Sequence, residues 1–116
     1  MRAVTYEEIA QTVTDIANAA ECKCTYRQWP KDSAPDPDYI LFYYLERDDM
    51  YADDEAYCKI TALNLELYTN AKNIEKEQIV ERAMHAADLT YQKSEMYIDS
   101  EEMYEVLYET EVIIDE

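Results

Sequence analysis

The sequence offers few aliphatic side chains from which to build a hydrophobic core. Leu, Ile, Val and Phe make up fewer than a fifth of the 116 residues, and 27 acidic side chains against 10 basic ones give a formal net charge of −17. Such a composition is typical of disordered chains. The sequence also has 12 Tyr, five Met and one Trp, and tyrosine carries a large apolar body with one polar tip. We therefore expect a single domain over residues 1–116 with a core built partly from tyrosine.

The absence of glycine and the acidic charge argue against several classes of function. A chain with no Gly lacks the phosphate-binding loops of conventional nucleotide enzymes. A negative surface repels nucleic-acid backbones and anionic membranes. No apolar run approaches the roughly 20 residues that span a bilayer, and the N-terminus lacks a signal-peptide pattern. We expect a cytosolic protein that binds neither a membrane nor a specific nucleic-acid sequence.

Hydrophobic periodicity divides the chain into two helices and five strands. Thr5 followed by Glu8 is a capping-box pattern for the first helix, and Asn73 is expected to cap the second. The expected strands are residues 22–29, 39–47, 57–69, 91–98 and 103–114, with a Pro-rich loop at 30–38. Short connections favour antiparallel neighbours. The pattern predicts an α+β domain: a mostly antiparallel sheet of about five strands with two helices on one face, in the order helix, three strands, helix, two strands.

An acidic segment follows the second expected strand. Residues 48–56 contain five carboxylates and no base, which predicts a solvated, flexible loop unless a partner orders it. The segment lacks the spacing and the glycine of a calcium loop. The candidate partner-binding residues are Asp48, Asp49, Tyr51, Asp53, Asp54 and Glu55.

The last expected strand alternates between two kinds of side chain. Tyr104 and Tyr108 share one side with Val106, Val112 and Ile114, while Glu105 and Glu109 share the other. We take these four residues as a candidate assembly strand. The alternative is an ordinary solvated outer face of a sheet.

Catalytic and metal-binding chemistry is sparse. Cys22, Cys24 and Cys58 are expected to be reduced thiols packed in strands, and a zinc site made by them with His85 matches no standard spacing. The only histidine lies within the second expected helix, and no nucleophile motif surrounds it. We expect no catalytic site, no metal and no cofactor. The strand tyrosines have three interpretations: packing across strands, a protein interface, or stacking on single-stranded nucleic acid.

Several short strings resemble one family over nearly the full chain. They are the Pro-rich loop entering Tyr39, YAD at 51–53, LELYT at 65–69, the acidic helix at 75–81 and, most specifically, SEEMYEVLYE at 100–109. In this succession the chain is similar to small tail-assembly proteins of siphophages and prophages of Gram-positive bacteria, of the tail-terminator or tail-to-head joining class.

The resemblance implies a non-enzymatic structural protein. It implies a homo-oligomeric ring, usually hexameric, that caps the phage tail tube and presents the docking surface for the head connector, in the host cytoplasm during assembly and then in the tail or neck of the virion. An acidic lumen suits a ring through which DNA passes, because carboxylates repel the backbone. The 48–55 segment is expected to face this lumen or a neighbouring component.

One rival function fits the same charge. A small acidic phage protein could mimic DNA and block a host DNA-binding protein, with binding that depends strongly on salt. The state of self-association distinguishes a ring from such a mimic.

Overall fold

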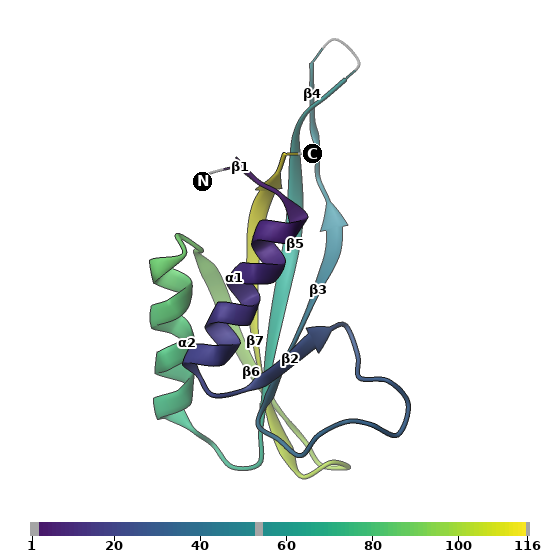
Figure 1. Ribbon diagram of the computed structural model, residues 1–116. Helices are drawn as coiled ribbons and strands as arrows, with labels where there is room; N and C mark the ends of the chain where they lie inside the picture. The colour runs from purple at the N-terminus through teal and green to yellow at the C-terminus, as the bar shows by residue number, and fades with distance from the viewer. Residues whose placement is uncertain (1–2, 53–54, 116) are drawn as a thin grey trace.

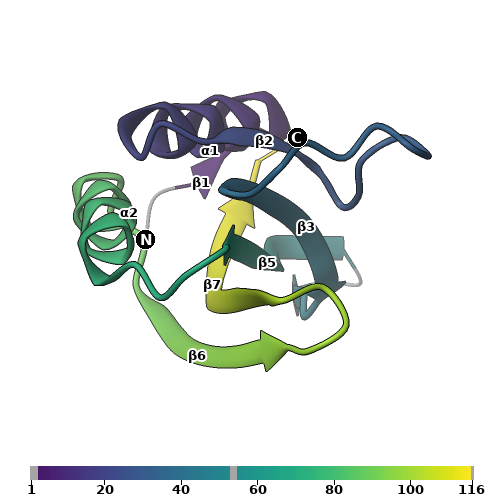
Figure 2. The ribbon, with the colours of Figure 1, turned by 90° about the horizontal axis from the view of Figure 1, so that it is seen from below.

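The computed structural model describes residues 3–52 and 55–115 and has the expected α+β class. Two helices lie on one face of a curled, mixed sheet (Figures 1 and 2). The elements in chain order are β1 (Ala3–Val4), α1 (Tyr6–Ala19), β2 (Lys23–Tyr26), β3 (Tyr39–Arg47), β4 (Met50–Ala52), β5 (Glu55–Thr69), α2 (Ile74–Ala86), β6 (Tyr91–Ile98) and β7 (Met103–Ile114).

The sheet is built around two long antiparallel strands. The β5 and β7 strands pair without interruption from Lys59 opposite Ile114 to Thr69 opposite Tyr104. The sheet order is β1-β7-β5-β3-β2, with β6 also paired to β7 and β4 also paired to β5. Leu63, Leu65 and Leu67 simply share the face that the helices cover.

The strand prediction needs one correction. The sheet has seven strands in the described residues, and the two that were not predicted are the short β1 and β4. Two pairs are parallel, β2 with β3 and β1 with β7, and the other pairs are antiparallel, so the sheet is mostly antiparallel as expected. The reason for the β2–β3 pairing is the long connection over residues 27–38, which returns the chain to the end of the sheet where β2 began.

The helices end without glycine in the position that usually requires it. Cys22 N donates to Ala17 O (2.8 Å) after α1, and Leu89 N donates to Met84 O (2.9 Å) after α2, the pattern in which the residue past the helix takes a left-handed conformation. Those residues are Glu21 (φ 56°) and Asp88 (φ 61°). At its start α1 has the predicted capping box, with Thr5 Oγ1 accepting from Glu8 N (3.1 Å) and Glu8 Oε1 accepting from Thr5 N (3.0 Å).

The core lies between the helices and the sheet and is more aliphatic than expected. Of the tyrosines whose side chains the structure describes, only Tyr39 and Tyr108 are buried. The other aromatic side chains pack in pairs near the sheet edges, such as Tyr26 against Phe42 and Tyr97 against Tyr104. The main core residues are Ile9, Val13, Ile16, Ile40, Phe42, Leu63, Leu65, Leu67, Val80, Met84, Val106, Tyr108, Val112 and Ile114.

Replacement of one buried leucine tests this core. Leu65 is 1% exposed in β5, whereas Leu45 in β3 is 57% exposed. Leu65→Ala is expected to lower the free energy of unfolding by about 2–5 kcal/mol, and the matched control Leu45→Ala by less than about 0.5 kcal/mol. Urea unfolding monitored by circular dichroism measures both. Equal effects of the two substitutions would contradict the assignment of the core face.

Candidate functional site

The predicted acidic loop is in fact a two-stranded arm. We define the arm as β4 and the first part of β5, residues 50–52 and 55–58, where Met50 lies opposite Cys58 and Ala52 opposite Glu55. It projects beyond the body of the sheet (Figure 1). The expectation of a flexible loop is therefore wrong for residues 50–52 and 55–56, because pairing with the extended β5 provides backbone hydrogen bonds that outweigh local composition.

The arm presents apolar side chains to solvent. Met50 is 55% exposed and Tyr51 is 68% exposed, and Leu45 just before the arm is 57% exposed. Large apolar side chains grouped on a projecting element are characteristic of a contact surface for another protein.

The acidic residues predicted for this segment divide into three groups. Asp48 is exposed at the base of the arm. Asp49 forms an ion pair with Arg47, whose Nε donates to Asp49 Oδ1 at 3.0 Å and whose Nη2 donates to Oδ2; the hydrogen bonds from Arg47 lower the pKa of Asp49. Asp53 and Asp54 lie outside the described residues, as does the side chain of Glu55. The base of the arm is thus less negative than its sequence suggested.

One residue of the candidate assembly strand, Tyr108, is not accessible for contact with another protein. Tyr108 is fully buried, and its hydroxyl donates to Glu81 Oε2 at 2.8 Å. It belongs to the core because it lies on the helix-covered face of β7 together with Val106. Tyr104 is partly buried against Tyr97, with ring centroids 4.9 Å apart.

Glu105 and Glu109 lie on the other face of the sheet, which the helices do not cover and which we call the open face. On this face a trough of about 530 Å³ has Asp48 and Glu109 in its lining, together with Glu46, Asn64 and Glu111. The structure therefore brings one residue from each predicted site to the same acidic surface.

The sequence analysis did not predict a pair of carboxyl groups on the open face, Glu66 and Glu105. Glu66 in β5 accepts hydrogen bonds from Tyr68 (3.1 Å) and Tyr43 (3.3 Å), and Asn64 donates to the Tyr43 hydroxyl (3.4 Å). Burial, a hydrogen bond to Glu66 and the charge of Glu66 raise the pKa of Glu105 to about 8. The signal in the sequence was the alternation of β5, which places Asn64, Glu66 and Tyr68 on one face.

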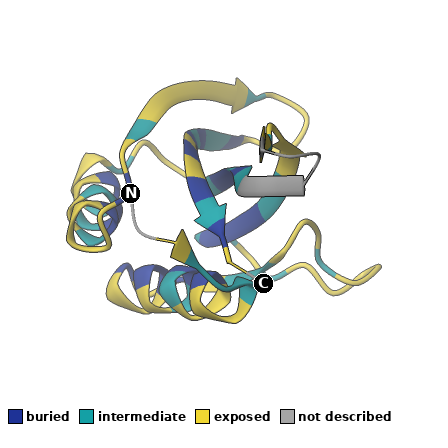
Figure 3. Ribbon diagram, turned by 90° about the horizontal axis from the view of Figure 1, so that it is seen from above, coloured by how far each residue is buried: buried dark blue, intermediate teal, exposed yellow. Residues whose placement is uncertain are grey.

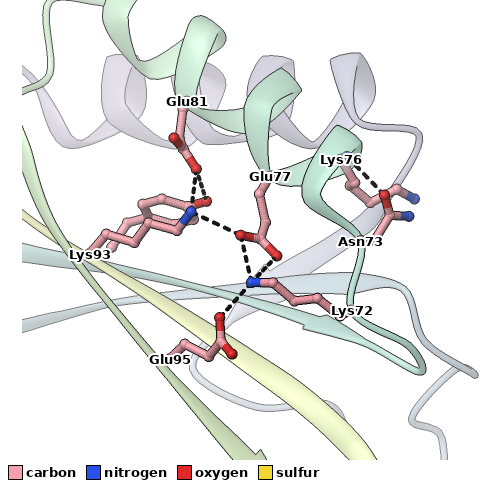
Figure 4. A network of polar contacts seen from close by, with 8 residues as sticks. Lys72, Asn73, Lys76, Glu77, Glu81, Lys93 and Glu95 are labelled. Carbon is pink, nitrogen blue, oxygen red and sulfur yellow. Dashed lines mark hydrogen bonds and ion pairs between the residues drawn. The ribbon is translucent and has the colours of Figure 1, made fainter.

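A second polar network fixes α2 to the sheet (Figure 4). Glu77 is 2% exposed on α2, and its carboxylate is held by Lys72 (2.7 Å) and by Lys93 of β6 (2.8 Å). Lys93 also contacts Glu81 at 2.9 Å, and Lys72 contacts Glu95. Burial acts to raise the pKa of Glu77, but the hydrogen bonds from Lys72 and Lys93 outweigh it and the pKa is lowered. A buried carboxylate that is fully paired in this way has a structural role.

The residues considered for a zinc site do not form one recognisable cluster. Cys22 is a buried free thiol whose pKa is raised by burial, and Cys24 is half-buried and free. His85 is exposed on α2, and the side chain of Cys58 lies outside the described residues. Within the described part of the chain, no three His, Cys, Asp or Glu side chains are grouped to hold a metal ion. In that part, neither helix is long and apolar enough to cross a bilayer.

The carboxyl pair predicts a dependence of stability on pH. The folded protein holds the Glu105 proton to about pH 8, whereas the unfolded chain releases it near 4.5, so the free energy of unfolding falls as pH rises across this window. Glu105→Gln is expected to remove this part of the slope, and Glu109→Gln, at an exposed position of the same strand, to retain it. Urea unfolding at several pH values between about 6 and 8 measures the slopes. A slope unchanged by Glu105→Gln would contradict the pairing.

Comparison with known proteins identifies a related fold. No protein-family model and no curated protein sequence matches the chain. Among solved structures, the chain is similar to a chain from the virion of a native gene transfer agent particle, with a TM-score of 0.60 and 13% sequence identity over 90% of both chains. At this identity the likeness shows that the two chains share a fold across almost their whole lengths.

Proposed function

We propose that this protein is a structural component of a phage-like virion and assembles as a ring at the junction of tail and head, as a tail terminator or a head–tail joining protein. The observation that carries the proposal is the fold shared with a chain of a gene transfer agent virion, which extends over nearly all of both chains. The family resemblance of the sequence supports the same class of protein.

The distribution of charge is compatible with that location. Glu109 and Glu111 lie on the open face of β7, and the trough beside them is lined by further acidic side chains. A surface of this kind repels a DNA backbone and does not grip it. If the open face borders the lumen of the ring, DNA passes a repulsive wall.

The arm supplies a contact for a neighbouring component. Met50 and Tyr51 of β4 are exposed, and the arm to which β4 belongs extends beyond the compact part of the domain (Figure 1). An element that projects in this way reaches the tail tube or the head connector without moving the core.

Deletion of the gene, with electron microscopy of the resulting particles, tests the proposed function. Overlong tails identify a terminator, and tails of normal length without heads identify a joining protein. Complete virions of normal infectivity would contradict both roles. If such virions formed and the purified protein bound a basic host protein in a salt-dependent manner, the DNA-mimic function would replace the proposal.

Complementation of the same deletion tests the role of the arm. Met50→Ser with Tyr51→Ser is expected to reduce the yield of complete virions at least about tenfold, because large aromatic and apolar side chains at the centre of interfaces contribute most of the binding energy. Ile74→Ser is the matched control, since Ile74 is 59% exposed on α2, away from the arm. Both variants are expected to retain the free energy of unfolding within about 0.5 kcal/mol. Full complementation by the arm variant would exclude the arm from the contact.

A further inference from the structure

The trough on the open face is a concave part of the sheet. It has a volume of about 530 Å³ and follows β5, which lies between β3 and β7. Three alternate residues of β5 form its floor: Ile60, Ala62 and Asn64. The sheet curls, and the mostly exposed strand β6 stands on one side of the buried central strands (Figure 3). The volume lies within the range of about 300–1,000 Å³ that ligand sites in proteins have.

Both walls of the trough carry carboxylates. Glu109 and Glu111 of β7 form one wall, and Glu46 and Asp48 form the other. All four residues are exposed, and none of them forms an ion pair with a described residue. The register of β3 against β5 shifts beside the second wall, and such bulges often aim side chains at binding sites.

The lining of the trough holds no compensating charge. No Lys, Arg or His is among the described residues that line it. Arg27 lies over the ring of Tyr43 on the same face, at 5.2 Å from the centroid, but is not part of the lining. By contrast, other carboxylates are held by bases of the same chain, as Asp38 is by Lys76 at 2.9 Å. The trough therefore presents concentrated negative charge to a ligand.

The floor of the trough offers a hydrogen-bond acceptor as well. Asn64 is 4% exposed, and its Nδ2 donates to the hydroxyl of Tyr43 at 3.4 Å. Its Oδ1 accepts no hydrogen bond from a described residue. Polar atoms of buried side chains nearly always have a partner, so a donor that enters the trough satisfies this oxygen. The walls and the floor thus present only acceptors at these positions, which fits a ligand with cationic donors.

The dimensions of the trough suit an extended peptide. The two walls stand on strands that are two strand spacings apart, about 9–10 Å. One extended chain fits between them, whereas an α-helix with its side chains is about 10–12 Å across. Glu109 and Glu111 are two residues apart on one strand, a separation of about 6–7 Å. Alternate side chains of an extended peptide have the same separation.

We propose that the trough binds an extended segment of a partner protein that carries Lys or Arg at alternate positions. The cationic heads lie between the carboxylates of the two walls, and the aliphatic stems of the same side chains cover Ile60 and Ala62. The inference goes beyond the proposed function, because it gives the open face a protein ligand. A face beside the lumen that repels a DNA backbone attracts such a segment by the same charge.

Binding of a fluorescent peptide to the full-length protein, measured by anisotropy at about 0.15 M salt, tests the proposal. The probe is an octapeptide in which Lys alternates with Thr. We expect Glu109→Gln with Glu111→Gln to weaken binding at least about tenfold. The control is Glu101→Gln with Glu102→Gln, which removes two charges from the exposed turn after β6. It is expected to change the affinity less than about twofold, because salt screens charges beyond about 8 Å.

The side-chain amide of Asn64 reports where the peptide binds. Its NMR resonances are expected to shift during the titration, whereas those of Asn18, which is exposed on α1, stay unchanged. Circular dichroism verifies that both double variants keep the fold.

The outcomes separate this inference from the proposed function. The inference is overturned by a wild type that does not bind the peptide at submillimolar concentration, by equal weakening in the two double variants, or by an Asn64 amide that does not respond. Each of these results leaves the proposed ring untouched. Complete virions from the gene deletion overturn the proposed function and leave the peptide site in place.

Discussion

The uninterrupted pairing of β5 with β7 is the interaction on which the rest of the molecule depends. The β5 strand supplies Leu63, Leu65 and Leu67 to the core face. The β7 strand supplies Val106, Tyr108 and Val112 to the same face. The helices pack on that face, and all the other strands attach to β5, to β7 or to β3, which itself pairs with β5. Because β5 continues past the end of β3, the same strand that organises the core also forms one side of the projecting arm. Core and candidate contact surface are thus parts of one element.

The acidic excess is distributed so that it does not oppose folding. Carboxylates near the core, such as Glu77 and Glu81, are held by lysines and by Tyr108. On the open face, Glu66 receives hydrogen bonds from two tyrosines, and Glu105 keeps a proton in preference to adding a second negative charge. Most of the other acidic residues that the structure describes are exposed, where charge is tolerated. The tyrosines act here as donors to carboxylates as much as they act as apolar bulk.

Much of the fold could be predicted from the sequence because it depends on local patterns. The Thr5 capping box and the alternation of 103–114 gave α1 and β7 with the correct faces. The parallel pairing of β2 and the strand character of Met50–Ala52 depend on partners distant in the chain, which periodicity does not reveal. The same limit applies to the site. The network of Glu77 with Lys93 depends on the packing of α2 against β6, and the contact of Glu66 with Glu105 depends on the register between β5 and β7, so both join residues of different elements. The assembly role of Tyr108 was wrong for a reason already visible in the pattern, because Tyr108 alternates in phase with the core residue Val106.

The central proposal is that this chain is a ring-forming structural component of a phage-like virion. Cryo-electron microscopy of purified particles tests it most directly. The account predicts density for this fold in a closed ring between the tail tube and the head, with the open face toward the lumen. Complete, infectious particles with no density for this protein at the junction would contradict it.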